Sequence, residues 1–85
     1  MIRVLSFFQE GCMACQEQEP INREVERALS LHIEAINPIK NRSMIEEYSL
    51  RVTPTTIILK DGNVVGRFEG VVHREQLEDA IKKYL

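Results

Sequence analysis

An apolar run near the N-terminus leads directly to two cysteines, and this segment reads Val4-Leu5-Ser6-Phe7-Phe8-Gln9-Glu10-Gly11-Cys12-Met13-Ala14-Cys15. The apolar run from Val4 to Phe8 is typical of a strand that is buried on both faces of a sheet. After Gly11 the apolar residues change to the spacing of a helix, at Ile21, Val25, Ala28 and Leu29. The stretch therefore predicts a buried strand, a short loop and a helix that opens at the two cysteines.

The residues that follow predict a second strand and a second helix. Pro20 lies inside the helix expected from about Cys12 to Leu29, and because proline lacks a backbone N–H group, it predicts a kinked or two-part helix. Polar and apolar residues alternate from Leu31 to Ile36, as they do in a strand, and Asn37-Pro38 indicates a turn. A short amphipathic helix is expected around Ser43–Tyr48.

The C-terminal part of the chain predicts a β-hairpin followed by a helix. Thr55 to Leu59 and Val64 to Phe68 have the composition of strands, and Asp61-Gly62 between them is typical of a tight hairpin turn. Gly66 lies inside the second of these strands and predicts a bulge or a thin spot there. Apolar residues at helical spacing then predict a last amphipathic helix, at Leu77, Ala80, Ile81 and Tyr84.

The predicted order of elements is thus β-α-β-α-β-β-α. The two early strands, each followed by a helix, should lie parallel with right-handed crossovers, and the hairpin should add an antiparallel half. We expect an α/β fold, with a four-stranded mixed sheet that is flanked by helices on both faces. A chain of 85 residues, 44% of them apolar and 28% charged, is expected to form a single domain over residues 1–85.

The composition excludes several classes of protein. The chain is too apolar for a disordered tail, and two cysteines are too few for a disulfide-dense scaffold. A net charge of −2 argues against a nucleic-acid binder, because such proteins carry a basic excess. No stretch approaches the roughly 20 apolar residues that a membrane span needs, and the run from Val4 to Phe8 is too short for the core of a signal peptide. We expect a cytoplasmic monomer, in a compartment that keeps thiols reduced.

Cys12 and Cys15 are the only cysteines, and their place at the start of a helix predicts redox chemistry. Unpaired N–H groups and the positive end of the helix dipole favour a thiolate there, so Cys12 should be the exposed nucleophile and Cys15 the covered resolving thiol. A zinc site would need about four ligands, and the only histidines, His32 and His73, are isolated in the sequence. A pair of inert structural thiols is the third reading, but Gly11 and the helix start make Cys12 accessible.

The sequence around the thiols is acidic, with Glu10, Glu17 and Glu19 and no Lys or Arg between Arg3 and Arg23. Negative charge nearby disfavours a thiolate, which opposes the effect of the helix dipole. We expect Cys12 to be only moderately activated. Such a thiol suits a reductant better than a strong oxidant, whose reduced form needs a highly stabilised thiolate.

Several motifs together resemble the thioredoxin/glutaredoxin superfamily over nearly the whole chain. Cys12-x-x-Cys15 follows the first strand, and Pro20 stands five residues after the second cysteine, where thioredoxins have a helix-kinking proline. The segment from Tyr48 to Thr55, which contains Thr53-Pro54, resembles the thioredoxin proline loop. Further matches are the hairpin at Lys60–Val64 and Gly70 before the last helix. The resemblance implies a small protein with the thioredoxin fold.

The resemblance also implies an activity, that of a protein-disulfide oxidoreductase in which Cys12 attacks a substrate disulfide and Cys15 resolves the mixed disulfide. It implies a cis peptide bond at Thr53–Pro54 and a substrate held by Met13, Ala14, Thr53, Pro54, Gly70 and Val71. The partners it implies are disulfide-containing proteins and an electron donor, either a thioredoxin-reductase-like enzyme or a low-molecular-weight thiol. No organic cofactor and no metal are expected.

This sequence departs from the family pattern at two positions near the cysteines. Ser6 stands where many thioredoxins bury an Asp, and Ala35 where they place a Lys beside it. The Asp and the Lys are both absent, which is physically consistent because either one alone would be a buried charge without a partner. Two alternative functions stay open, a glutathione-linked glutaredoxin-like reductase and a non-enzymatic metal-binding or interaction module on the same fold.

Overall fold

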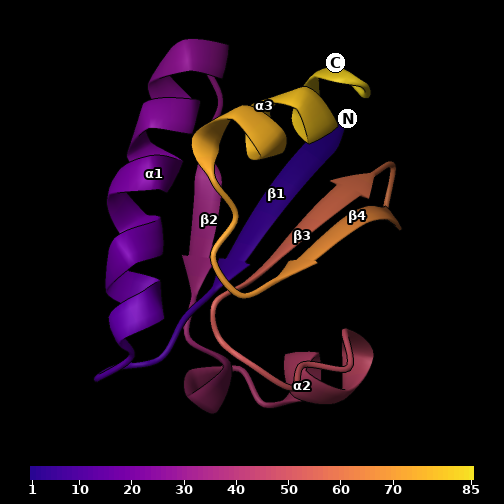
Figure 1. Ribbon diagram of the computed structural model, residues 1–85. Coiled ribbons are helices and arrows are strands. Elements are labelled where there is room, and N and C mark those ends of the chain that lie inside the picture. Colours follow the sequence, from indigo (N-terminus) through magenta and orange to yellow (C-terminus); the bar gives the residue numbers. More distant parts are fainter.

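The computed structural model describes residues 1–85 and contains one four-stranded sheet with helices packed against it (Figure 1). The strands are β1 (Ile2–Phe7), β2 (Ile33–Ile36), β3 (Thr55–Lys60) and β4 (Asn63–Glu69). The helices are α1 (Met13–Leu29), the 3₁₀ helix η1 (Pro38–Lys40), α2 (Ser43–Glu47) and α3 (Arg74–Lys82). None of these helices has the length and apolar character that crossing a membrane requires.

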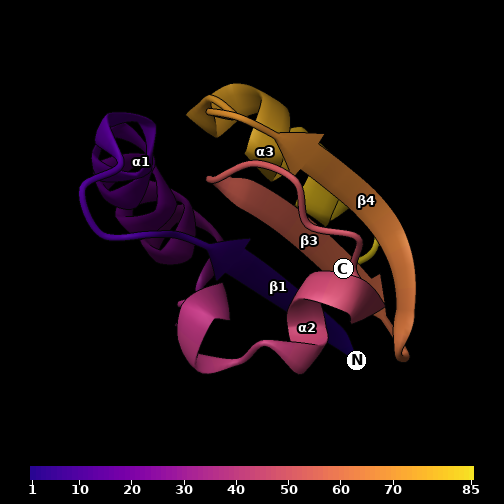
Figure 2. The ribbon, with the colours of Figure 1, turned by 90° about the horizontal axis from the view of Figure 1, so that it is seen from below.

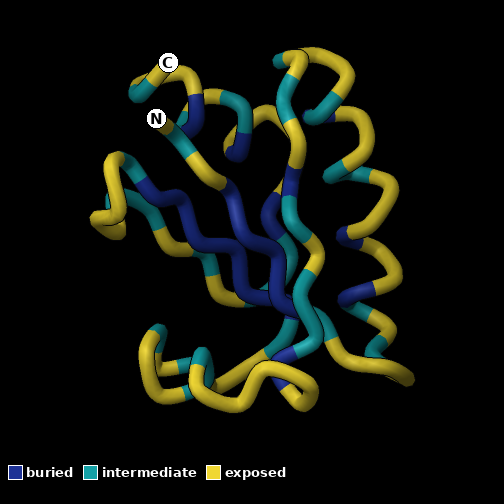
Figure 3. The backbone as a smooth tube through the Cα atoms, turned by 180° about the vertical axis from the view of Figure 1, so that it is seen from behind, coloured by how far each residue is buried: buried dark blue, intermediate teal, exposed yellow.

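The sheet has the strand order β2-β1-β3-β4 and is mixed. β1 runs parallel to β2 and antiparallel to β3, which in turn pairs antiparallel with β4. The predicted order of elements and the four-stranded mixed sheet are therefore confirmed. Burial is concentrated in the two central strands, β1 and β3 (Figure 3).

Alternate residues of β1 supply the core on the two faces of the sheet. Val4 packs on one face with residues of α1 and α3, including Val25 and Leu77. Leu5 and Phe7 pack on the other face, where the segment around α2 covers them. Figure 2 shows α1 and α3 on one side of the sheet and α2 on the other. Helices on both faces were predicted, and the period of two along a strand is the physical cause.

Two elements differ from their predicted form. α1 continues through Pro20 as one helix, so of the two predicted forms, kinked or two-part, the two-part form is wrong. Buried side chains on both sides of this proline, Gln18 and Val25, hold the helix against the rest of the molecule, and such packing outweighs the loss of one backbone hydrogen bond. β2 begins at Ile33 rather than at Leu31, because the N–H group of Leu31 still bonds to the helix, at the carbonyl of Glu26.

The hairpin matches its prediction closely. Asp61 and Gly62 both have positive φ, 52° and 85°, as the favoured two-residue hairpin turn requires. The register shifts between Ile58 and Leu59, which creates a bulge in β4 beside Gly66. A Cβ atom at Gly66 would lie 3.0 Å from Ile58 Cδ1, so a larger residue would crowd this strand.

Candidate functional site

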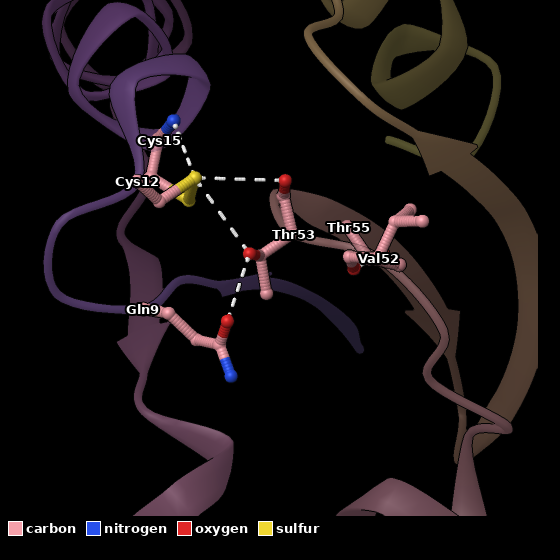
Figure 4. The surroundings of a disulfide bond; sticks show 6 residues. All are labelled: Gln9, Cys12, Cys15, Val52, Thr53 and Thr55. Atoms are coloured by element: carbon pink, nitrogen blue, oxygen red, sulfur yellow. Dashed lines mark hydrogen bonds between the residues drawn. A yellow bond between two sulfur atoms is a disulfide. The ribbon is translucent and has the colours of Figure 1, made fainter.

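The two cysteines lie at the start of α1 and form a disulfide bond (Figure 4). Cys12 is the N-cap residue and has extended backbone angles, φ −95° and ψ 110°. The N–H group of Cys15 donates to Cys12 Sγ at 3.1 Å, so this sulfur takes one of the unpaired amide donors of the helix. Cys15 is 8% exposed, whereas Cys12 is only partly covered. The first sulfur is therefore the accessible one, as the sequence predicted.

The loop between α2 and β3 brings Thr53 against the first sulfur. The Thr53 hydroxyl donates to Cys12 Sγ at 3.6 Å, and the Thr53 carbonyl oxygen lies 3.6 Å from the same atom. The bond between Thr53 and Pro54 is cis, as the resemblance implied, and Pro54 is buried. Figure 4 shows Thr53 pointing at the disulfide from the opposite loop, with Gln9 on its other side.

The segment before α3 completes the surroundings of the disulfide. Gly70 donates its N–H group to the carbonyl of Pro54 at 2.8 Å and has φ +85°, a conformation that a side chain would strain. Val71 continues the chain from there and is half-buried. Met13 lies between the cysteines and is 83% exposed, and Ala14 beside it is partly covered. Contacts thus join Thr53, Pro54 and Gly70 in one loop cluster, while Met13 points to solvent.

A cavity of about 170 Å³ lies beside the second cysteine, and its wall includes Ser6 and Ala35 as well as Cys15. Ser6 and Ala35 are partners across the β1–β2 ladder. The two positions at which the sequence departs from the thioredoxin pattern therefore adjoin the cavity next to the resolving thiol. Neither of them carries a charge there.

Two polar side chains of this region were missed in the sequence. Gln18 and Asn22 belong to the same face of α1 as Cys15, and Asn22 Nδ2 donates to Ser6 Oγ at 3.0 Å. Gln18 is 1% exposed. Their spacing of three and seven residues after Cys15 was the available signal, because it continues the buried stripe of the helix toward Val25.

The charged groups near the disulfide are exposed, and they form no metal site. Glu10, Glu17 and Glu19 are all exposed, and Glu19 pairs with Arg23 one helical turn away. His73 precedes α3 without capping it through its side chain. No group of three or more His, Cys, Asp or Glu side chains is arranged to hold a metal ion. The groups that lie nearest to the disulfide are the Thr53 hydroxyl and carbonyl and the Cys15 amide.

Comparison with known proteins gives a family match over almost the entire chain. A family model described as Thioredoxin matches residues 1–83. The thioredoxin of Chlamydia pneumoniae is 34% identical over 82 residues, covering 95% of this chain and 80% of that protein. Chloroplastic thioredoxin Y2 of Arabidopsis thaliana is 32% identical over 84 residues, covering 96% of this chain and 50% of that protein. The chain thus spans about half the length of the chloroplastic relatives it matches.

Solved structures agree with the match. A structure of thioredoxin-2, described as a component of malaria parasite protein secretion machinery, superposes with a TM-score of 0.91 at 27% identity and covers 98% of this chain and 82% of that one. Reduced Schistosoma mansoni thioredoxin gives a TM-score of 0.89 at 26% identity, over 99% of this chain and 79% of that one. The disulfide at the helix start, the proline loop opposite it and these matches lead to one conclusion. The chain belongs to the thioredoxin family.

Proposed function

We propose that this protein is a thiol–disulfide oxidoreductase that reduces disulfide bonds in other proteins. The observation that carries the proposal is the Cys12–Cys15 disulfide at the N-terminus of α1, which faces the carbonyl and hydroxyl of Thr53. The form described here, with the disulfide closed, is then the oxidised enzyme at the end of one catalytic cycle.

The reaction follows from the exposure of the two sulfurs. In the reduced protein the Cys12 thiolate attacks one sulfur of a substrate disulfide, and the other substrate sulfur leaves as a thiolate that takes up a proton. Cys15 then loses its proton and attacks Cys12 Sγ, which releases the second substrate sulfur and closes the Cys12–Cys15 disulfide. Two electrons pass from the dithiol to the substrate, and the amide donor on Cys12 Sγ stabilises the thiolate in the first step.

The substrate groove is proposed to lie between the first turn of α1 and the two loops opposite it. An extended substrate backbone would pair with Thr53 and be held by Pro54, Gly70 and Val71. Met13 and Ala14 would contact its side chains, and the exposed, flexible thioether of Met13 suits varied partners. The hydrogen bond from the Gly70 N–H group to the Pro54 carbonyl supports this assignment, because it holds the two loops next to each other.

The electron donor and the place of action belong to the same proposal. A thioredoxin-reductase-like enzyme or a low-molecular-weight thiol restores the dithiol, and no organic cofactor takes part. A reversible disulfide needs a reducing compartment, for which we propose the cytoplasm. A chloroplast is the other such compartment to test, because some relatives are named as chloroplastic.

Reduction of insulin by dithiothreitol tests the proposal. The protein should accelerate the reaction, and both Cys12→Ser and Cys15→Ser should lose turnover. Cys15→Ser should in addition accumulate mixed disulfides with insulin through Cys12, because the resolving thiol is gone. Thiol titration and mass spectrometry measure these species.

Two results would contradict the proposal. Turnover by Cys12→Ser equal to that of the wild type would exclude Cys12 as the nucleophile. Stoichiometric zinc with blocked thiols in the purified protein would instead support a metal-binding module.

A further inference from the structure

Gln18 is a buried polar side chain in the helix of the cysteines, and the mechanism above leaves it without a role. It is 1% exposed, and its amide group makes three hydrogen bonds. Nε2 donates to the Val72 carbonyl at 3.0 Å and to Asn22 Oδ1 at 2.9 Å, and Oε1 accepts from the Val72 N–H group at 2.8 Å. One side chain thus binds both backbone groups of a residue 54 positions away.

The residue that Gln18 binds lies in a segment without strand or helix structure. Val72 is 2% exposed and lies between β4 and α3, so no ladder or helix pairs its backbone groups. Buried N–H and C=O groups need partners, because leaving one unpaired costs about 1–3 kcal/mol. Gln18 supplies both partners, in the way that a neighbouring strand would supply them elsewhere in the sheet.

The same segment is fixed at its other end to the proline loop. Gly70 donates to the Pro54 carbonyl at 2.8 Å, and two residues later Val72 is bound by Gln18. Val71 lies between these two attachments. Hydrogen bonds therefore connect the proline loop, through residues 70–72, to Gln18 of α1, which lies three residues after Cys15.

We propose that Gln18 is a positioning residue for protein substrates, which sets the placement of Gly70 and Val71 relative to the redox helix. This inference rests on the proposed function. An extended protein substrate would use the backbone at residues 70 and 71 as well as the sulfurs. A small disulfide needs the sulfurs alone, so the hydrogen bonds of Gln18 should favour reaction with protein disulfides over reaction with small ones.

The test compares two substrates of the reduced protein in single-turnover reactions. The second-order rate constant for insulin is divided by that for hydroxyethyl disulfide. In Gln18→Met, which is similar in size but makes no hydrogen bonds to Val72, this ratio should fall about fivefold or more. Displacement of the backbone at residues 70 and 71 should slow the reaction with insulin more than the reaction with hydroxyethyl disulfide, because only insulin uses that backbone. Asn22→Ala is the matched control, since it removes the third hydrogen bond of the Gln18 amide but keeps both bonds to Val72. Its ratio should stay near that of the wild type.

A second variant and a hydrogen-exchange measurement test the role of Gln18 if Gln18→Met does not fold. Gln18→Asn stays polar but is one methylene too short to reach Val72, and it should lower the ratio in the same direction. In the wild-type protein the Val72 amide should exchange its hydrogen slowly, at the rate of core amides rather than of an open loop.

The outcomes separate this inference from the proposed function. An unchanged ratio in the folded variants, or a rapidly exchanging Val72 amide, overturns the role of Gln18 while both disulfides are still reduced. If the wild type reduces neither disulfide, the proposed function itself is wrong.

Discussion

Among single residues, Cys15 and Thr53 each place a hydrogen-bond donor at the first sulfur, beside the Thr53 carbonyl oxygen. The Cys15 amide lies 3.1 Å from Cys12 Sγ, and the Thr53 hydroxyl lies 3.6 Å from it. Hydrogen bonds to the charged form of a group favour that form. The reactivity of Cys12 should therefore depend on Thr53 in a way that can be measured by replacing one hydroxyl.

Thr53→Val should slow alkylation of Cys12 by iodoacetamide about two- to fivefold near neutral pH, because one donor to the thiolate is lost. Alkylation of the reduced protein, followed by mass spectrometry, measures the rate. Valine has nearly the shape of threonine, so the change removes little beside the hydroxyl.

Thr56→Val is the matched control in the next strand. The Thr56 hydroxyl is buried and has no hydrogen-bond partner, so its loss should leave alkylation unchanged. It should also leave the free energy of unfolding unchanged or raise it by up to about 1 kcal/mol, since a buried unpaired hydroxyl is unfavourable. Equal slowing of alkylation in both variants would show that the Thr53 hydroxyl has no particular role.

At the scale of elements, the end of α2 is attached to the edge of the sheet by one side chain. Arg67 in β4 donates to the backbone carbonyls of Tyr48 and Ser49, and it also pairs with Glu69. The two carbonyls lie at the C-terminal end of α2, the short helix that precedes the proline loop. The side chain of Arg67 is 30% exposed, whereas that of Arg51, which also pairs with Glu69, is 75% exposed.

Arg67→Met should therefore lower the free energy of unfolding by about 1–2 kcal/mol, because it removes the donors to two carbonyls. Arg51→Met should change it by no more than about 0.5 kcal/mol, as exposed ion pairs contribute little. Urea unfolding followed by circular dichroism measures both. A loss of equal size in the two variants would place the effect in the pairing with Glu69 and not in the carbonyls.

For the molecule as a whole, ion pairs make stability depend on pH, and one of them, between Arg3 and Glu34, joins β1 to β2. The hydrogen bonds from Arg67 and Arg51 lower the pKa of Glu69, and the hydrogen bond from Arg3 lowers the pKa of Glu34. The folded protein therefore releases these protons more readily than the unfolded chain does. The resulting stabilisation is complete above the ordinary pKa of Glu, about 4.3, and is lost as the pH falls through the lower folded-state values.

We expect urea midpoints that are steady from neutral pH down to about pH 5 and that decrease below it. Glu34→Gln and Glu69→Gln should each flatten this decrease, since the substituted side chain no longer binds a proton. Glu17→Gln is a control on the exposed surface, and it should retain the wild-type pH dependence. A double variant Glu34→Gln/Glu69→Gln with the full wild-type decrease would contradict the assignment.

The place of the two cysteines was predicted because its signals are local. The cysteines stand three apart at the start of a helix, and the hairpin has its own turn residues. The resemblance added what spacing does not contain, the cis bond at Thr53–Pro54. The extent of α1 was predicted closely, but its division into two parts at Pro20 was wrong, because packing of the helix against the sheet outweighs the loss of one backbone hydrogen bond. The polar residues Gln18 and Asn22 were missed. Their partners, Val72 and Ser6, are distant in the sequence, and the spacing of residues along one helix does not reveal such partners.

By itself the sequence determined the order of the elements, the mixed sheet and the place of the two thiols, since periodicity and turn chemistry act between near neighbours. The groups that meet across the fold became known from the three-dimensional structure alone. Gln18 binds the backbone of Val72 54 residues away, and Arg67 binds that of Tyr48 19 residues away. Hydrogen bonds between distant residues depend on how the helices and loops pack against the sheet, and no spacing along the chain encodes that packing.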